Sequence, residues 1–276
     1  MIFNSGRFQL DLSKPRVMGI VNVTPDSFSD GGKFNTTEKA IAHALQLVEE
    51  GADILDIGGE STRPGATPVP LDEELKRVIP VIEGLRDVGV PLSIDTYKPQ
   101  VMQAAITAGA DIVNDVCALR EPQALKIVAT SQAGVCLMHM QGRPQTMQAD
   151  PQYDDVVSEV RDFLKDRLDA AVQAGIDRSR IMLDPGFGFG KRTAHNLTLL
   201  NHLNDIQILG LPLLIGLSRK SVLGQVVGSS VDERIHASIA ASVVSVMKGA
   251  NIVRVHDVKP TIDALKIVQA VMNEKQ

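Results

Sequence analysis

The sequence predicts an α/β protein with the (β/α)8 TIM-barrel fold, formed by a single domain over residues 1–276. Three observations lead to this prediction. The length of 276 residues is close to the roughly 250 residues of a typical barrel of this kind. Short apolar runs rich in β-branched residues alternate with polar loops and amphipathic stretches along the whole chain. No linker, low-complexity segment or composition shift divides the sequence.

Eight apolar runs are the predicted strands. Their residues are apolar on both faces, which is typical of parallel strands covered by helices. They occupy residues 17–22, 53–58, 92–96, 111–116, 135–140, 181–185, 213–217 and 252–255. An open, doubly wound sheet has the same alternation of elements and is the alternative. Eight units of about 34 residues favour the closed barrel.

Helices are predicted between these strands from the spacing of apolar residues. In residues 37–50, for example, Ile41, Ala44 and Val48 follow the i, i+3, i+7 pattern of one helix face. The other predicted helices include residues 72–87, 99–108, 154–174, 232–248 and 261–273.

A short repeat supports this division of the chain. The sequence GADI begins at Gly51 and again at Gly109, and GANI begins at Gly249. Each glycine follows a predicted helix and precedes a predicted strand, where a left-handed residue commonly ends the helix. We therefore expect the same helix-to-strand junction at all three places.

The composition excludes several classes of function. The net charge of −5 makes the chain a poor general binder of nucleic acid. No apolar run is long enough to cross a membrane or to act as a signal peptide. The two cysteines, Cys117 and Cys136, have neither metal-site nor redox-pair spacing, so we expect reduced thiols and a cytoplasmic protein.

Polar residues stand at the carboxyl ends of the predicted strands, where barrels of this class carry their chemistry. They are Asn22, Asp56, Asp95, Asn114, Asp115, His139, Asp184, the segment 218–221, Arg254 and His256. Any one of them could cap a helix or hold a loop, and this simpler interpretation stays plausible for Asp56 and Asp115. Their occurrence at eight strand ends together favours an active site.

The two ends of this site are predicted to differ in charge. After the seventh and eighth strands stand Lys220, Ser221, Arg254 and His256, in the loops that often bind phosphate. A solvated basic turn is the alternative there. Asp95 and Asp184 suit a nitrogen-rich heterocycle, or form a general acid–base pair. A substrate with a polar heterocycle and a phosphate tail matches both ends.

Three loops are predicted to be flexible and functional, at residues 24–35, 59–70 and 185–191. They carry the side chains Phe28, Thr62, Arg63, Pro64, Phe187 and Phe189. The third loop, PGFGFGK, lacks the glycine and hydroxyl positions of a P-loop. No cluster of residues has zinc-ligand spacing.

The sequence resembles the dihydropteroate synthases over essentially its whole length. The motifs that carry the resemblance are IVNVTPDSFSDGG (20–32), GADILDIGGESTRPGA (51–66), SIDTYKP (93–99), NDV (114–116), LDPGFGFGK (183–191), GLSRKS (216–221) and RVHDV (254–258). The resemblance implies a transferase of folate biosynthesis that joins 4-aminobenzoate to a dihydropterin pyrophosphate and releases pyrophosphate. It also implies a homodimer, a Mg2+ cofactor and inhibition by sulfonamides.

The resemblance also implies roles for the strand-end residues. Asp95, Asn114 and Asp184 would bind the pterin ring, Lys220 its carbonyl side, and Arg254 its face. His256 and Asn22 would address the pyrophosphate, with Asn22 beside Mg2+. Thr62, Arg63 and Ser221 would frame the aminobenzoate and phosphate sites, and Phe28, Pro64 and Phe189 would enclose the aminobenzoate ring. The catalytic group would be Asp95, Lys220, Arg63 and His256.

Two other functions share parts of this pattern. A pterin-binding methyltransferase would use the acidic residues but would have no use for the basic segments 218–221 and 254–256. A non-catalytic pterin- or phosphate-binding barrel could lose Phe28, Thr62 or Arg63, yet all three are present. Both alternatives are therefore disfavoured.

Overall fold

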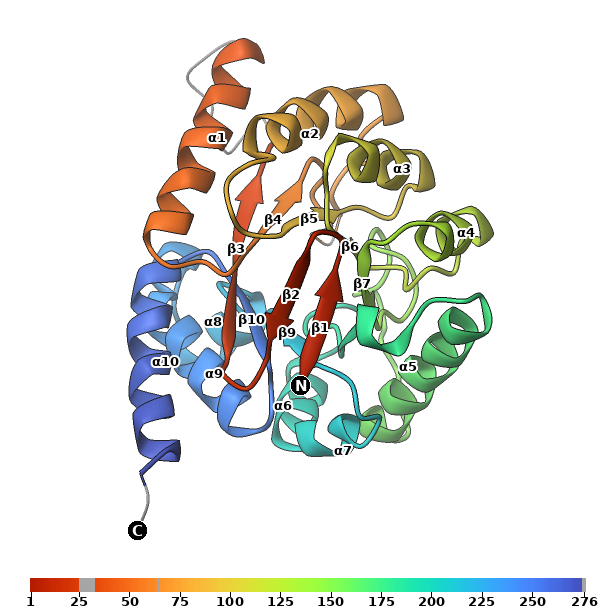
Figure 1. Cartoon of the computed structure of the whole chain (residues 1–276). Coiled ribbons are helices and arrows are strands. Elements are labelled where there is room, and N and C mark those ends of the chain that lie inside the picture. The colour runs from red at the N-terminus through yellow and green to blue at the C-terminus, as the bar shows by residue number, and fades with distance from the viewer. Residues whose placement is uncertain (25–32, 64, 275–276) are drawn as a thin grey trace.

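The protein is a closed eight-stranded parallel barrel surrounded by helices (Figure 1). The computed structural model describes residues 1–24, 33–63 and 65–274. The sheet order is β8-β7-β6-β5-β4-β3-β10-β9. A parallel bridge between Leu183 and Leu213 joins the two edges, and the amide of Leu183 donates to the carbonyl of Pro212 at 2.9 Å. The TIM-barrel prediction is confirmed, and the open sheet is excluded.

The barrel strands are close to their predicted ranges. They are β3 (Arg16–Asn22), β4 (Ile54–Gly58), β5 (Leu92–Asp95), β6 (Ile112–Asp115), β7 (Gly134–Met138), β8 (Ile181–Asp184), β9 (Leu214–Ile215) and β10 (Ile252–Val255). Alternate residues of these strands face the barrel interior and the helices. The interior cluster at the amino ends of the strands includes Met18, Ile54 and Ile112, whereas Val17 and Leu55 pack with the helices. Both faces are buried, which is why each strand is a continuous apolar run.

Helices cover the outside of the barrel (Figure 1). They are α1 (Lys33–Glu49), α2 (Leu71–Leu85), α3 (Pro99–Ala108), α4 (Pro122–Thr130), α5 (Val156–Gln173), α6 (Thr193–Asn201), α7 (Leu203–Gln207), α8 (Ser221–Val227), α9 (Ile235–Met247) and α10 (Val258–Met272), with the 3-10 turns η2 (Arg178–Arg180) and η3 (Val231–Glu233). The helix predicted at residues 232–248 begins at Ile235 in the structure, because the residues before it form the separate turn η3. Ser230 and Glu233 form a capping box that closes η3 as a separate turn. None of the described helices is long and apolar enough to cross a membrane.

The repeated helix-to-strand junction is confirmed. Gly51, Gly109 and Gly249 have φ angles of 104°, 122° and 102°. These values lie in a region that a residue with a Cβ rarely adopts, so glycine is required by the turn itself. At Gly109, two carbonyls of the preceding turn, those of Ala105 and Ile106, accept hydrogen bonds from its amide.

A two-stranded hairpin that the sequence analysis did not predict closes the amino end of the barrel. It consists of β1 (Ile2–Ser5) and β2 (Phe8–Asp11), paired antiparallel, and it lies across the barrel opening (Figure 1). Phe3 is fully buried against the interior layer of Met18, Ile54 and Cys136. The strands are only four residues long and half exposed, so they carry little of the periodicity that marks the barrel strands.

Candidate active site

Arg254 lies at the centre of a charged cluster at the carboxyl ends of the barrel strands. Its Nε is 2.6 Å from Asp56 Oδ2, and its Nη2 is 2.7 Å from Asp95 Oδ2. The side-chain amide of Asn114 donates to the same Asp56 oxygen at 3.1 Å. Strands β4, β5, β6 and β10 thus bring four predicted strand-end residues together inside the barrel.

Asp56 belongs to this cluster rather than to a loop or a helix cap. Its side chain is completely buried, and its Oδ2 accepts from both Arg254 and Asn114. The sequence analysis left its role open. Asp115 follows the simpler interpretation, because its carboxylate accepts from the backbone amides of Cys117 and Leu119 at 2.7 Å each. Position in the sequence did not separate the two aspartates.

Two carboxylate oxygens of the cluster are buried without a hydrogen-bond partner among the described residues. They are Oδ1 of Asp56 and Oδ1 of Asp95. A buried acceptor without a donor is costly in a folded protein. Both oxygens could accept hydrogen bonds from the ring N–H or amino groups of a bound heterocycle.

Burial shifts the pKa values of three groups in the barrel mouth, Asp95, Asp184 and Lys220. It raises the pKa of Asp95 to about 7, although the charge of Arg254 opposes the shift. Burial also raises the pKa of Asp184, against the attraction of Lys220. Burial lowers the pKa of Lys220 to about 8, and this effect is larger than the opposing attraction of Asp184. Groups that titrate near pH 7 in a barrel mouth are typical of an active site.

Lys220 connects the seventh strand end to the phenylalanine loop at residues 185–191. Its Nζ donates to the carbonyl of Phe187 and lies 4.6 Å from the centre of the Phe189 ring. The carboxylate of Asp184 accepts from the backbone amide of Gly186 at 2.7 Å. A Cβ at Gly186 would lie 1.8 Å from the carbonyl oxygen of His139, so the loop can pass there only with glycine.

The phenylalanine loop, predicted to be flexible, is tied down by a buried lysine. Lys191 is 3% exposed, and its Nζ contacts the carbonyls of Gly186 and Phe189 at 2.8 and 3.1 Å. It also lies 2.9 Å from Nδ1 of His139. Burial lowers the pKa of Lys191 well below its usual value and that of His139 to about 2. Lys191 and His139 therefore hold the loop through buried hydrogen bonds.

His256 faces the seventh strand end from the eighth. Its Nδ1 is 3.0 Å from Ser218 Oγ, and its backbone amide donates to the same oxygen at 3.2 Å. Burial lowers the pKa of His256 to about 3, and the charges of Arg254, Arg219 and Arg63 add to this effect. The charge of Asp257 opposes the shift, but the imidazole is neutral at pH 7 and has three arginines near it, a setting that suits a bound polyanion.

The loop at residues 59–70 is anchored by Glu60. Its carboxylate accepts from the hydroxyl of Tyr97 at 2.9 Å and from the amide of Val69 at 3.2 Å, and it pairs with Lys98. Lys98 also pairs with the fully buried Glu74. Glu60 thereby fastens both ends of a loop that was predicted to be flexible.

The predicted site residues of the loops at 24–35 and 59–70 lie only in part within the described residues. Thr62 is partly exposed and Arg63 is exposed. Phe28 and Pro64 lie outside the described residues. Ser221 is exposed at the first position of α8, directly after Lys220.

Asn22 ends strand β3 and is partly exposed, beside Gly58 of β4 in register. The described residues contain no group of three or more His, Cys, Asp or Glu side chains that could hold a metal. Mg2+ commonly keeps several waters and binds through one or two protein oxygens together with substrate phosphates. The amide oxygen of Asn22 is a suitable protein ligand for such a site.

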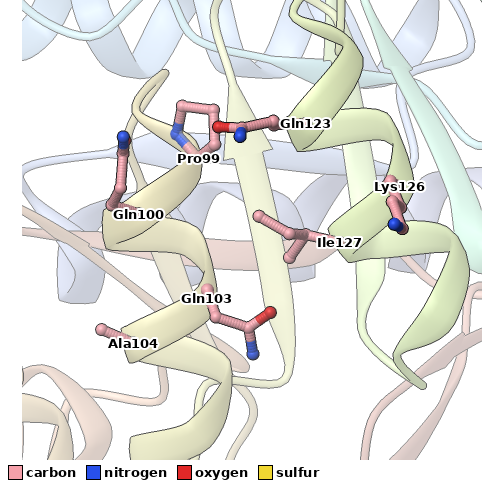
Figure 2. Close-up of a pocket in the computed structure, with 7 residues that line it drawn as sticks. All are labelled: Pro99, Gln100, Gln103, Ala104, Gln123, Lys126 and Ile127. Atoms are coloured by element: carbon pink, nitrogen blue, oxygen red, sulfur yellow. The ribbon is translucent and has the colours of Figure 1, made fainter.

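A groove on the outside of the barrel, between α3 and α4, is separate from this cluster (Figure 2). It has a volume of about 450 Å3 and is lined by Pro99, Gln100, Gln103, Ala104, Gln123, Lys126 and Ile127. None of these residues is a predicted site residue.

Comparison with known proteins identifies the family. The model of the pterin binding enzyme family matches residues 18–256. Dihydropteroate synthase of Neisseria meningitidis serogroup B is 52% identical, and the match covers 98% of this chain and 97% of that protein. The chain belongs to the dihydropteroate synthase family.

Solved structures of the same family have the same fold. Xanthomonas albilineans dihydropteroate synthase with 4-aminobenzoic acid is 56% identical, with a TM-score of 0.92 and coverage of 97% and 96%. The complex of the enzyme from that organism with 7,8-dihydropteroate gives 52% identity, a TM-score of 0.91 and full coverage of both chains. Yersinia pestis dihydropteroate synthase with a sulfonamide is 48% identical, with a TM-score of 0.94 and coverage of 99% and 100%.

Proposed function

We propose that this dihydropteroate synthase family member transfers the 7,8-dihydropterin-6-ylmethyl group from its pyrophosphate ester to 4-aminobenzoate, giving 7,8-dihydropteroate and pyrophosphate. The observation that carries the proposal is the near-complete match to relatives at about half identity, among them the Xanthomonas albilineans enzyme, which was solved with 4-aminobenzoic acid and with 7,8-dihydropteroate. The barrel mouth supports it through an acidic part, formed by Asp56, Asp95, Asn114 and Asp184, and a basic part, formed by Lys220, Ser221 and His256. The predicted separation of charge is wrong for Arg254, which pairs with Asp56 and Asp95 inside the acidic part. By the same likeness, we expect sulfonamides to compete with 4-aminobenzoate.

The acidic part of the cluster would bind the pterin. The unpartnered oxygens of Asp56 and Asp95 would accept hydrogen bonds from ring donors, and Asn114 and Asp184 would add an amide and a third carboxylate. Two carboxylates hold the guanidinium of Arg254 in place, and its planar shape suits stacking on the ring. Lys220 stands between Asp184 and Phe189 and would reach the carbonyl side of the ring.

The reaction would be dissociative. The bond between the methylene carbon and pyrophosphate breaks, and its electron pair leaves with the pyrophosphate. The resulting cation spreads into the dihydropterin, where ionised Asp95 stabilises it. The aniline nitrogen then forms the new C–N bond and loses a proton. An aniline is weakly basic, so this step needs no strong general base.

The basic part of the mouth would hold the leaving group. The neutral imidazole of His256 offers one N–H, and Lys220 and Arg63 contribute positive charge. Mg2+, when bound through Asn22 and the substrate phosphates, would neutralise further negative charge. Thr62 and Ser221 would frame the phosphate and aminobenzoate sites, and Phe28, Pro64 and Phe189 would enclose the aminobenzoate ring.

A pyrophosphate-release assay tests the function. The mixture contains the dihydropterin pyrophosphate and Mg2+, with and without 4-aminobenzoate, and a parallel sample contains EDTA. We expect release that depends on aminobenzoate, with dihydropteroate formed in equal amount. Pterin binding without release would instead indicate a binding protein. Release that is unchanged in EDTA would exclude the Mg2+ requirement.

We also propose a homodimer in the cytoplasm. Large apolar side chains are exposed on α8, α9 and α10, which lie side by side (Figure 1). They are Val226, Val227, Val244, Met247, Ile267, Val271 and Met272. Such a patch is typical of a protein interface. Light scattering during size-exclusion chromatography would give twice the chain mass of 29.7 kDa, and a single-chain mass would exclude the dimer.

A further inference from the structure

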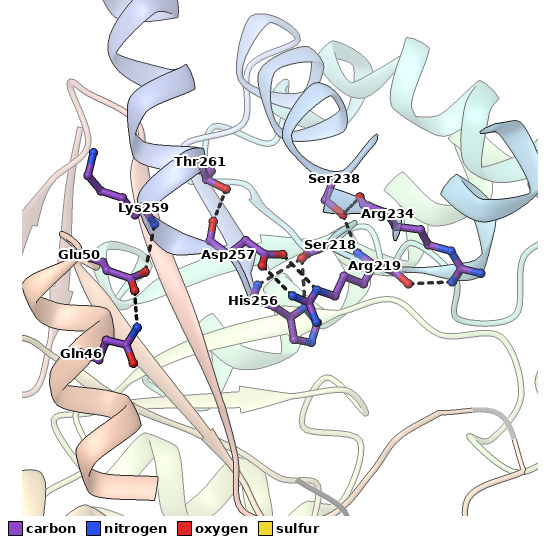
Figure 3. Close-up of polar contacts among 10 residues, drawn as sticks. All are labelled: Gln46, Glu50, Ser218, Arg219, Arg234, Ser238, His256, Asp257, Lys259 and Thr261. Carbon is purple, nitrogen blue, oxygen red and sulfur yellow. Dashed lines mark hydrogen bonds and ion pairs between the residues drawn. The ribbon is translucent and has the colours of Figure 1, made fainter. Parts of the chain in front are cut away.

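An ion pair joins the two loops that carry the basic part of the barrel mouth (Figure 3). Arg219 Nε is 3.0 Å from Asp257 Oδ2, and Arg219 Nη2 is 2.6 Å from Asp257 Oδ1. The contact is therefore two-pronged, the geometry in which a guanidinium fixes a carboxylate most firmly. Arg219 precedes Lys220, and Asp257 follows His256.

Both residues of this ion pair depart from what is usual at their positions, Arg219 in its backbone conformation and Asp257 in its side-chain contacts. Arg219 has a φ of 58°, the left-handed region, which costs about 1 kcal/mol for a side chain of this kind. Asp257 occupies the N-cap position of α10, where an aspartate commonly accepts from the first helical amides. Here its side chain makes no capping hydrogen bond. Local backbone preference and helix capping therefore do not explain why an arginine is at position 219 and an aspartate at position 257.

Neighbouring contacts fix the same two loops. Ser218 contacts His256 one residue before the ion pair, so residues 218 and 219 face residues 256 and 257 in order. The backbone amide of Arg219 donates to Ser238 Oγ at 2.9 Å, and its carbonyl accepts from Arg234 Nη1 at 3.0 Å. Figure 3 shows this chain of contacts. Arg219 is thus held from α9 on one side and from the α10 loop on the other.

We propose that Arg219 and Asp257 are positioning residues, whose ion pair holds Lys220 and Ser221 in register with His256 for binding the pyrophosphate group. The inference rests on the proposed function for the identity of that group. Arg219 acts through its neighbours, because its Nε and one Nη are occupied by Asp257. Without the pair, the hydrogen bonds between Ser218 and His256 remain to join the two loops.

The test combines single, double and reversed variants. Arg219→Asn is chosen because asparagine tolerates the left-handed conformation, and it is compared with Asp257→Asn and the double variant. We expect each single change to lower kcat/KM for the dihydropterin pyrophosphate at least about tenfold. The double variant should lose no more than about threefold beyond the weaker single variant. The reversed pair, Arg219→Asp with Asp257→Arg, should recover part of the loss.

The matched control is the pair of Arg16 and Asp53 at the opposite end of the barrel, 2.8 Å apart. Its side chains are 29% and 21% exposed, against 38% and 15% for Arg219 and Asp257. Arg16→Asn and Asp53→Asn should lower the melting temperature with kcat/KM within about twofold of the unmodified protein. Where Arg219→Asn does not fold, Arg219→Lys, which keeps the charge and loses the two-pronged contact, takes its place.

Calorimetric binding of inorganic pyrophosphate with Mg2+ separates this inference from the proposed function. At least about tenfold weaker binding in both single variants supports the inference even where the unmodified protein turns over no substrate. Three outcomes would overturn it. In the first, both single variants bind pyrophosphate and turn over substrate as the unmodified protein does. In the second, the two losses of kcat/KM multiply in the double variant. In the third, only Arg219→Asn has an effect. The last outcome would make Arg219 a direct ligand.

Discussion

Arg254 Nη2 lies 2.7 Å from Asp95 Oδ2, although their strands β10 and β5 are separated in the sheet by β3 and β4. The guanidinium therefore crosses the barrel interior. It holds Asp95 beside a positive charge while burial favours the protonated acid, so the pKa is about 7. A carboxylate in this balance changes its charge within the physiological range.

This balance predicts a narrow pH optimum. The pKa of Asp95 is raised to about 7, so the ionised form is lost as pH falls below that value. The pKa of Lys220 is lowered to about 8, so its charge is lost as pH rises above that value. We expect a bell-shaped profile of kcat/KM for the dihydropterin pyrophosphate, with limbs near these two values.

Two substitutions identify the group that titrates in each limb of the pH profile. Asp95→Asn should lower kcat/KM at least about a hundredfold and remove the acidic limb. Lys220→Arg should move the alkaline limb upward, because a guanidinium stays charged. An acidic limb that persists in Asp95→Asn would come from the substrate phosphates, and full turnover in that variant would contradict the role given to Asp95.

The buried acidic pair at the second loop depends on one lysine. Lys98 pairs with both Glu60 and Glu74, whose side chains are 6% and 0% exposed. Lys98→Met should lower the free energy of unfolding by about 3–5 kcal/mol, because it leaves buried carboxylates without a cation. Urea unfolding measures the change.

An exposed lysine provides the control for that prediction. Lys259 pairs with Asp263 on α10, and their side chains are 57% and 54% exposed. Lys259→Met should change the free energy of unfolding by less than about 0.5 kcal/mol. Adding Glu74→Gln to Lys98→Met should restore part of the loss. Equal costs at Lys98 and Lys259 would show that the buried network is not stabilised by its cation.

His139 should make the fold sensitive to acid. Its pKa is lowered from 6.5 to about 2, so below pH 6.5 the unfolded chain takes up a proton that the folded protein does not. The free energy of unfolding therefore falls as pH falls, by up to about 1.4 kcal/mol per pH unit for this group. Asp95 and Asp115, whose pKa values are raised to about 7 and about 6, act in the opposite direction.

A comparison of variants isolates the histidine contribution. Between pH 7.5 and 5.5, His139→Gln should lose less stability than the unmodified protein, by about 1–2 kcal/mol. Identical slopes for the unmodified protein and His139→Gln would contradict a neutral His139 in the folded state.

The hairpin should contribute to stability without taking part in the reaction. Phe3 is fully buried at the closed end of the barrel. Phe3→Ala should lower the free energy of unfolding by about 3–5 kcal/mol through loss of buried surface and the cavity left behind. Below its melting temperature, turnover should stay within about twofold. The control is Ile2→Ala, at a side chain that is 49% exposed, and a similar cost there would contradict the argument.

The barrel could be predicted because its determinants are local. Buried parallel strands are continuous apolar runs, and amphipathic helices repeat between them. Their carboxyl ends all reach one mouth, so Asp95, Asn114 and Arg254 could be grouped before any coordinates. The hairpin was missed because its short strands are stabilised by Phe3 and the barrel interior rather than by their own pattern.

Pairings between distant residues could not be predicted. Asp56 and Arg254 are 198 residues apart, and nothing near Asp56 distinguishes it from Asp115. Lys98 carries no sign in the sequence that it will lie between two glutamates. Arg219 resembles any arginine in a basic turn until its left-handed backbone and its contact with Asp257 are seen. These relationships depend on the register and closure of the barrel.

The hairpin covers the amino end of the barrel, and the interior layer that includes Met18, Ile54 and Cys136 fills the space between that end and the charged cluster, so the site opens toward the carboxyl ends of the strands. Whatever reaches Asp95 and Asn114 arrives through a single opening and leaves by the same way. We expect a second molecule bound nearer the opening to hinder the departure of the first. Such a site would favour ordered binding, in which the molecule nearer Asp95 and Asn114 binds first.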